Sequence, residues 1–266
     1  MRELGKEFQE IIHEQFEFRE LFYQMTSRDL LLRYKQTVMG LGWALLAPIL
    51  NTVVFSVVFM RVAPIQTPVP YPLFAYCGLL AWNFTGAALR FAVTSLTGNA
   101  NLVTKVYFPR EIFPFAAVAV SFVDFAVAAA VLVGMMAYYH VGSVASLVFL
   151  PAVLVVHIAF TTALALLLAM ANLFYRDVKY LFEVVLTFWM FASAIVYPVD
   201  AVQGMLGTLI RANPMTGIVD AYRRVLLYGT APDPASFASV AALSLLLLPA
   251  AWLVFHRSEF RFAENI

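Results

Sequence analysis

The chain has 266 residues, of which 62% are hydrophobic and 12% are charged, and its formal net charge is +1. An ordinary globular domain is about a quarter charged, so this composition excludes a soluble fold of this size and indicates that lipid surrounds much of the chain. The near-neutral charge argues against a nucleic-acid partner, which usually requires a basic surface. The one cysteine, Cys77, excludes an intrachain disulfide and a multi-cysteine metal site.

The first 27 residues predict an amphipathic helix. Apolar residues recur at mostly three- and four-residue steps from Leu4 to Met25, while glutamates between Glu3 and Glu17 occupy other faces. We expect this helix to lie in the membrane interface. The alternative is a helix packed on another soluble element.

Residues 28–266 predict a transmembrane domain that is entirely α-helical. Residues 36–60 contain no Asp, Glu, Lys or Arg, and such a run is long enough to cross about 30 Å of hydrocarbon at about 1.5 Å per residue. The six expected spans lie at about 38–60, 73–97, 113–138, 146–172, 181–197 and 235–256.

The segment before the last span contains two half-length apolar stretches. They fall within residues 199–233 and are interrupted by Asn213-Pro214 and by Gly229. Each stretch is too short to cross a bilayer, so we expect two re-entrant or interfacial helices.

Lys and Arg divide unequally between the two sides that six spans define. Twelve lie on the side of the termini, whereas four lie on the other side, namely Arg61, Arg211, Arg223 and Arg224. The positive-inside rule therefore places both termini in the cytosol.

The sequence lacks three motifs that are common at nucleotide-binding and catalytic sites. It has no GxxxxGK[ST] nucleotide-binding loop and no GxSxG nucleophile motif, and its four histidines are scattered without an HExxH spacing. We therefore expect no catalytic residue, no metal site and no cofactor in this chain.

Asp124 and His157 are ionisable residues well inside expected spans. Such groups can form a proton or ion site, or they can form interhelical hydrogen bonds. With only two groups on separate spans, the sequence favours hydrogen bonds.

Two kinds of feature have both a structural and a functional interpretation. The connectors GNANLVTKVYFPRE (98–111) and FYRDVKY (174–180) are either solvated loops or docking elements for a cytosolic partner. The aromatic residues near expected interfaces, Tyr71, Tyr76, Trp82, Phe84 and Tyr197, form either an ordinary interfacial belt or a path on which sugar rings stack.

Several passages, in order along nearly the whole chain, carry a family resemblance. They are RDLLLRYKQTVMGLGWALLAPIL (28–50), YPLFAYCGLLAWNF (71–84), GNANLVTKVYFPREIFP (98–114), YRDVKYL (175–181), FWMFASAIVYPV (188–199) and NPMTGIVDAYRRVLL (213–227). The sequence resembles the membrane-spanning subunit of type-2 ABC exporters, specifically the permeases for O-antigen, capsule and teichoic-acid polysaccharides. Ala81 departs from the family, which commonly has a proline before the tryptophan.

The resemblance implies a homodimer in the bacterial inner membrane. It also implies two copies of a separate cytosolic ATPase subunit, which would bind the ATP and Mg, and a lipid-linked polysaccharide as cargo. The alternatives are an exporter of the same type for a drug or another lipid, and a membrane-embedded transferase that acts on lipid-linked sugars.

The resemblance also suggests three sets of site residues. Arg28, Arg33 and Lys35 are candidates for binding the lipid-pyrophosphate head group, although they can equally serve only to set the topology. The candidates for an aromatic glycan path are Trp43, Phe55, Phe59, Trp189, Phe191 and Tyr197. The candidates for coupling to the ATPase are Asn101, Lys105, Tyr107, Arg110, Glu111, Arg176, Asp177 and Lys179.

Overall fold

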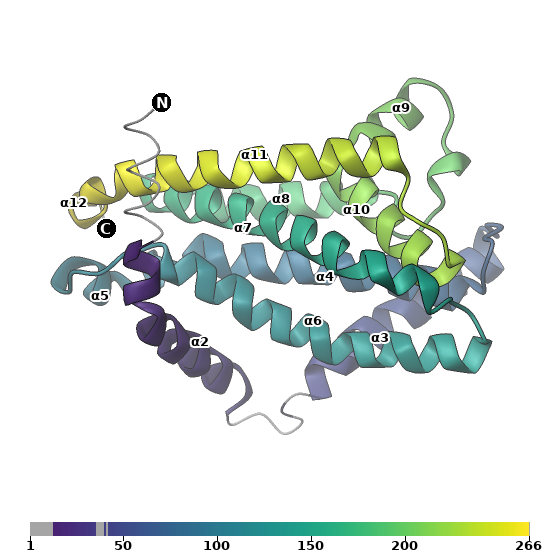
Figure 1. The fold of residues 1–266 in the computed structure, drawn as a ribbon, viewed down its shortest axis with the longest axis horizontal. Helices are drawn as coiled ribbons and strands as arrows, with labels where there is room; N and C mark the ends of the chain where they lie inside the picture. The colour runs from purple at the N-terminus through teal and green to yellow at the C-terminus, as the bar shows by residue number, and fades with distance from the viewer. Residues whose placement is uncertain (1–12, 36–39, 41, 266) are drawn as a thin grey trace.

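The computed structural model describes residues 13–35, 40 and 42–265, and these residues form helices joined by short connections (Figure 1). The α-helices in chain order are α2 (Arg19–Tyr34), α3 (Gly42–Val57), α4 (Tyr71–Ser95), α5 (Ala100–Lys105), α6 (Ile112–Tyr139), α7 (Leu150–Phe174), α8 (Val178–Phe191), α9 (Gly204–Ala212), α10 (Pro214–Arg223), α11 (Pro234–Ser258) and α12 (Phe262–Asn265). The π-helical turns are η1 (Val58–Val62) and η5 (Arg224–Tyr228), and the 3-10 turns are η2 (Thr97–Asn99), η3 (Ala145–Phe149), η4 (Val199–Ala201) and η6 (Glu259–Arg261).

Within the described residues, five helical segments are long and apolar enough to cross a membrane. They are Gly42–Val62, Tyr71–Ser95, Ile112–Tyr139, Ala145–Phe174 and Pro234–Arg261. These five coincide within a few residues with five of the six expected spans. The long helices lie side by side as a bundle, with α5 and α12 at one end and α9 at the other (Figure 1). We refer to these as the α5/α12 end and the α9 end.

The helix at the fifth expected span is shorter than the sequence suggested. The apolar run continues to Tyr197, but α8 has 14 residues and ends at Phe191. After it, residues 192–194 form a turn, and Ala194 has a positive φ of 48°, which is incompatible with a continuing α-helix. The apolar pattern could not show this break because residues 192–197 stay apolar while the backbone turns.

The expected amphipathic helix falls partly outside the described residues, because residues 1–12 are not described. Residues 13–17 are helical, and α2 continues the helical segment to Tyr34, beyond the predicted end at residue 27. Helix α2 packs obliquely against α6 (Figure 1).

Helix α4 is the centre of the bundle. It packs against α3, α6, α7, α8 and α10, and most of its side chains are buried. The aromatic residues that sequence assigned to a membrane interface lie in this core instead, since Tyr71, Tyr76, Trp82 and Phe84 are at most 5% exposed. Two of them donate hydrogen bonds to backbone carbonyls, Tyr71 to Val196 at 2.7 Å and Tyr76 to Ala128 at 2.9 Å.

The two short helices expected before the last span are α9 and α10. Asn213 ends α9 and caps α10, because its side-chain oxygen accepts a hydrogen bond from the Met215 backbone N–H at 3.0 Å. Pro214 follows at the first helical position, where it removes no helical hydrogen bond. The segment ends after η5 at Gly229, whose φ of 68° favours glycine.

Arg223 on α10 is buried, although the sequence placed it among the loop cations opposite the termini. It is 4% exposed, and its guanidinium lies 3.6 Å from the centre of the Phe74 ring. Its Nη1 donates to the Ala194 carbonyl at 2.9 Å and its Nη2 donates to the Ile195 carbonyl. Arg223 therefore holds the backbone that turns after α8 against α4 and α10.

Gly78 on α4 lies where Arg223 meets the turn after α8, and a larger residue there should destabilise the protein. A Cβ atom at position 78 would lie 2.7 Å from the Arg223 Nη2 and against the Ile195 carbonyl oxygen. We expect Gly78→Ala to destabilise the protein by about 1–3 kcal/mol, because the backbone cannot yield as a flexible side chain can. Thermal unfolding of the purified protein measures the effect.

Gly134→Ala in α6 is the matched control. No described atom lies within 4 Å of the Cβ position there. An alanine in a helix interior is more favourable than glycine by about 0.5–1 kcal/mol, so Gly134→Ala should keep or raise the melting temperature. Equal melting temperatures for the two variants would contradict the assigned role of Gly78.

Candidate functional site

Asp124 connects α2 to the middle of α6. Its carboxylate accepts hydrogen bonds from the Arg33 guanidinium and the Tyr34 hydroxyl, and it forms an ion pair with Arg33. Burial, reinforced by the hydrogen bond to Asp124, raises the pKa of Tyr34 to about 12, so this tyrosine stays protonated as a donor. Arg33 also lies 3.8 Å from the centre of the Phe91 ring.

This cluster changes what the three head-group candidates can do. Arg33 is paired with Asp124, and the side chains of the two residues are only 18% and 20% exposed. Arg28 is more accessible, although it pairs with Asp29 at 2.8 Å and donates to the Asn99 side chain at 3.1 Å. Lys35 is exposed just beyond the end of α2. A ligand can therefore approach Arg28 and Lys35 directly, whereas Arg33 must first leave its partner.

A polar cavity lies beside Asp124, between α3, α4 and α6. It encloses about 220 Å³, and its polar lining includes Asn51, Asn83, Arg90 and Asp124. Trp43, one of the glycan-path candidates, lines the same cavity and is 51% exposed. The cavity thus combines amide groups, charges and an aromatic face, which is the chemistry that recognises a polar, hydroxyl-rich ligand.

The other aromatic candidates lie on α3, η1 and α8, or just after α8. Phe55 and Phe59 stack with their ring centres 6.3 Å apart, and both pack partly against the core. Trp189 is partly buried against Trp82 and donates to the Asn213 side chain at 3.1 Å.

Phe191 and Tyr197 lie on either side of the turn that follows α8. The Phe191 ring is 50% exposed, and the Tyr197 hydroxyl donates to the Phe191 carbonyl at 2.5 Å. Of the six candidates, Trp43 and Phe191 present the most accessible rings.

His157 is held in an interhelical hydrogen-bond network. Its Nε2 lies 2.8 Å from the Thr85 hydroxyl, and its Nδ1 lies 3.1 Å from the Tyr222 hydroxyl. The residue is 1% exposed and therefore joins α4, α7 and α10 inside the bundle. Both intramembrane ionisable groups that the sequence singled out make interhelical hydrogen bonds.

The eight coupling candidates separate into exposed residues and internal ones. Asn101, Lys105 and Tyr107 are exposed on or just after α5, and Arg176 and Asp177 are exposed just before α8. Lys179 is half-buried, and its backbone N–H donates to the Asn172 side chain at 3.2 Å. Arg110 and Glu111 face inward and make contacts with the end of α11.

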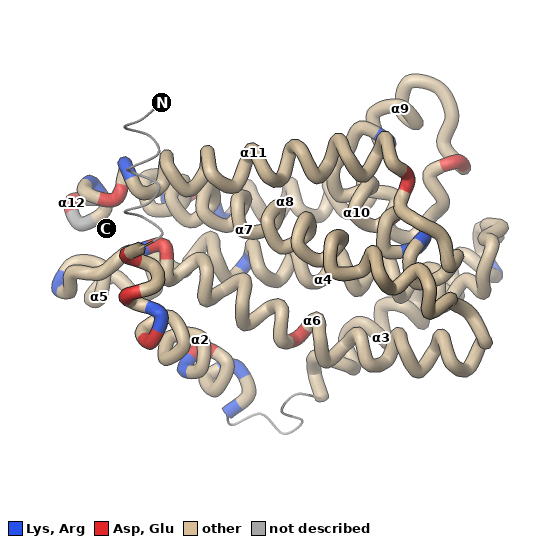
Figure 2. The backbone as a smooth tube through the Cα atoms, in the orientation of Figure 1, with Lys and Arg blue, Asp and Glu red and all other residues tan. Residues whose placement is uncertain are grey.

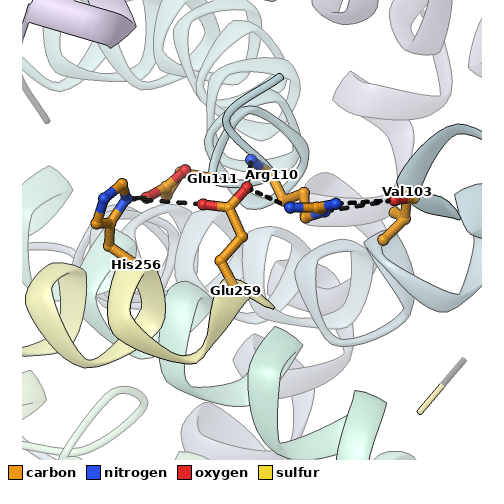
Figure 3. Close-up of polar contacts among 5 residues, drawn as sticks. All are labelled: Val103, Arg110, Glu111, His256 and Glu259. Atoms are coloured by element: carbon orange, nitrogen blue, oxygen red, sulfur yellow. Dashed lines mark hydrogen bonds and ion pairs between the residues drawn. The ribbon is translucent and has the colours of Figure 1, made fainter. Parts of the chain in front are cut away.

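These contacts form a brace between α5, the start of α6 and the end of α11 (Figure 3). Glu259 accepts from the Arg110 guanidinium at 2.9 Å and from the Arg110 backbone N–H at 3.0 Å. Arg110 also donates to the Val103 carbonyl at 3.2 Å, and the Nδ1 of His256 lies 3.0 Å from Glu111. The brace fixes the 98–112 connector relative to the last long helix.

Three of these residues have the side-chain types and spacing of a metal-ligand set. Glu111, His256 and Glu259 each offer one ligand atom, and these atoms lie within 4.8 Å of one another. Arg110 pairs with Glu259 and His256 pairs with Glu111, so contacts within the protein already account for the closeness of these groups. The sequence missed His256 and Glu259 because they lie in the last residues of the chain, about 145 positions from their partners.

The sequence relationships agree with this architecture. The family model described as ABC-2 type transporter matches residues 20–227, which run from α2 into η5. This chain belongs to that family. It is therefore a multi-pass membrane transport component, and members of this family work with an ATPase subunit.

Named relatives are similar to the chain over nearly its full length. An O-antigen export system permease protein RfbA from Myxococcus xanthus is 27% identical over 258 residues, which cover 96% of this chain and 99% of that protein. A protein of the same name from Klebsiella pneumoniae is 24% identical over 247 residues, which cover 92% of this chain and 94% of that protein.

A double-mutant cycle tests the link between α2 and α6. We expect Arg33→Gln and Asp124→Asn each to lower stability, and the double variant to lose less than their sum, with a coupling free energy of about 0.5–3 kcal/mol. Unfolding of the purified protein in detergent provides the measurement. The exposed pair Arg28→Gln and Asp29→Asn is the control, because a solvent-accessible ion pair contributes about 0–1 kcal/mol. Additive effects at Arg33 and Asp124 would show that the pair contributes nothing.

Removing a carboxylate from the brace around Arg110 should also lower stability. Glu259→Gln leaves Arg110 without its carboxylate and should destabilise the protein by about 1–3 kcal/mol. Glu264→Gln removes an exposed carboxylate at the same end of the chain and should be neutral. Protease cleavage within the 98–112 connector should also accelerate in Glu259→Gln only. Equal cleavage rates in the two variants would contradict a bracing role.

Proposed function

We propose that the chain is the permease subunit of an exporter that moves a lipid-linked polysaccharide of the O-antigen kind across the bacterial inner membrane. The observation that carries this proposal is the full-length similarity to permeases named for O-antigen export, which reaches 99% of the length of one relative. The similarity includes both the long helices and the short α9 and α10 region, and does not stop at a shared fragment.

Charge distribution supports a six-span topology with cytosolic termini. Lys and Arg concentrate along α2 and at the α5/α12 end, with fewer near the α9 end (Figure 2). Arg223 is buried and does not count as a loop cation, so the number of loop cations on the side opposite the termini is even smaller. In this topology α8 and residues 192–203 after it make the fifth crossing in chain order, which returns the chain to the α9 end and brings the total to six.

An ATPase subunit would dock at the α5/α12 end. The 266 residues contain no GxxxxGK[ST] nucleotide-binding loop, so ATP and Mg would be bound by the partner. The exposed candidates Asn101, Lys105, Tyr107, Arg176 and Asp177 offer both charge and an aromatic ring for that contact. The internal brace at Arg110 would transmit a push on this connector to α6 and α11.

A homodimer would bury apolar surfaces of α3 and α8. Exposed apolar residues line both helices, including Val53 and Val54 on α3 and Val184 and Phe188 on α8. Both helices pack on α4 of the same chain. A translocation path between two copies would place the exposed rings of Trp43 and Phe191 beside it.

The cargo would be received at the α2 side of the polar cavity. A pyrophosphate group could pair with Arg28 and Lys35, since charge-assisted hydrogen bonds to phosphate are strong. It could also compete with Asp124 for Arg33, which would release α2 from α6. In this way head-group binding and movement of α2 would be linked.

The deciding experiment reconstitutes the chain with its ATPase subunit in lipid nanodiscs and measures ATP hydrolysis. We expect a purified lipid-linked O-antigen polysaccharide to stimulate hydrolysis several-fold. The same lipid pyrophosphate without its glycan is the control for the head group, and an ATPase with a substituted P-loop lysine is the control for background. Stimulation by an unrelated amphiphilic drug, with none by the glycolipid, would overturn the assignment of the cargo.

A further inference from the structure

A groove separate from the polar cavity lies between the N-terminal helical segment and the bundle. It encloses about 410 Å³, and most of its lining is apolar. The lining residues that matter here are Gln15, Arg19, Phe22, Phe115, Phe122 and Trp252. They come from the segment around the start of α2, from α6 and from α11, so an occupant would touch all three.

Two hydrogen-bond donors line this groove without partners. The side-chain Nε2 of Gln15 and the Nε1 of Trp252 are both buried, and neither makes a hydrogen bond to any described residue. Unpaired buried donors are rare and unfavourable in proteins, and hydrocarbon offers them no acceptor. Neither nitrogen is exposed to the groove as the side chains stand, but both side chains line it, and rotation of either would turn its donor toward an acceptor oxygen of an occupant.

The groove combines an apolar wall along α6 with a cation on the N-terminal segment. Along α6, Phe115 and Phe122 are seven steps apart, and at about 1.5 Å per step they mark an apolar wall of roughly 10 Å. The wall runs from near the start of α6 into its membrane-spanning part. Arg19 is exposed on the N-terminal segment and supplies a cation to the same lining.

We propose that this groove binds an anionic phospholipid of the surrounding membrane. One acyl chain lies along Phe115 and Phe122, and the phosphate lies beside Arg19. When the Gln15 and Trp252 side chains rotate toward the groove, the phosphate or ester oxygens accept hydrogen bonds from their Nε2 and Nε1 atoms. An amphiphile with this order of groups satisfies the charge, the two donors and the apolar wall together.

This lipid is distinct from exported cargo because the two cavities use different faces of α6. Phe115, Phe122 and their neighbours one turn apart line the groove, whereas Ser121, Asp124 and Phe125 line the polar cavity. The bound lipid would act as a structural link that holds the N-terminal segment against α6 and α11. It would thereby set the position from which α2 moves.

Quenching of tryptophan fluorescence by brominated lipids tests the site in the full-length chain, assembled with its ATPase subunit in nanodiscs. The contribution of Trp252 is the difference between the unmodified chain and Trp252→Phe. Dibrominated phosphatidylglycerol and dibrominated phosphatidylcholine are compared at increasing mole fractions in unbrominated phosphatidylcholine. We expect half-quenching of Trp252 at a roughly fivefold lower mole fraction of the anionic lipid, because one Arg lies beside its phosphate.

Two variants separate a lipid site from general contact with the bilayer. Arg19→Gln should abolish the preference for the anionic lipid, and Gln15→Leu, which keeps the side-chain size but removes the donor, should weaken quenching by both lipids several-fold. Lys105→Gln removes an exposed cation outside the groove and should leave quenching unchanged.

Three outcomes would overturn the proposal. Equal half-quenching by the two lipids would show ordinary bilayer contact, and so would an unchanged preference in Arg19→Gln. Absence of Trp252 quenching by either lipid would show that protein covers the groove, whether from a second copy, the ATPase subunit or the first residues of the chain. None of these results depends on the polysaccharide or on ATP hydrolysis, so they leave the proposed export function open to its own test.

Discussion

The structure depends on one interaction, which is the pairing of polar side chains from different helices inside the bundle, where hydrocarbon supplies no partner. Asp124 meets Arg33 and Tyr34, and His157 meets Thr85 and Tyr222. Each of these contacts joins different helices. The polar residues therefore determine how the apolar helices are positioned against one another, which apolar packing alone specifies weakly in lipid.

Polar contacts within the protein also organise the two ends of the molecule, in different ways. At the α5/α12 end, paired charges around Arg110 and Glu259 fix a connector that has exposed neighbours. Toward the α9 end, Arg223 binds backbone carbonyls that the turn after α8 leaves free, and no carboxylate is required. Ion pairs thus hold the exposed connector in place at the α5/α12 end, whereas toward the α9 end a buried arginine links the short helix α10 to the core.

The sequence located the helices, but it did not show which of the candidate site residues are accessible. The periodicity and length of apolar runs located five long helices. Whether a candidate site residue can bind a ligand or partner depends on how exposed its side chain is, which these patterns do not show. Arg33 and Glu111 carried the right charge, yet the structure pairs both with residues about 90 or 145 positions away. Tyr34, His256 and Glu259 had no local signal, because their importance lies entirely in those distant partners.

By itself, the sequence determined that lipid is the solvent, where most helices begin and end, and which family the chain belongs to, because these follow from local composition and ordered motifs. Only the tertiary structure decided that Tyr76 and Trp82 are core residues, that α8 ends at Phe191, and that Arg223 is buried. Those features depend on which surfaces meet. An apolar or charged residue looks the same in sequence whether it faces lipid, water or another helix.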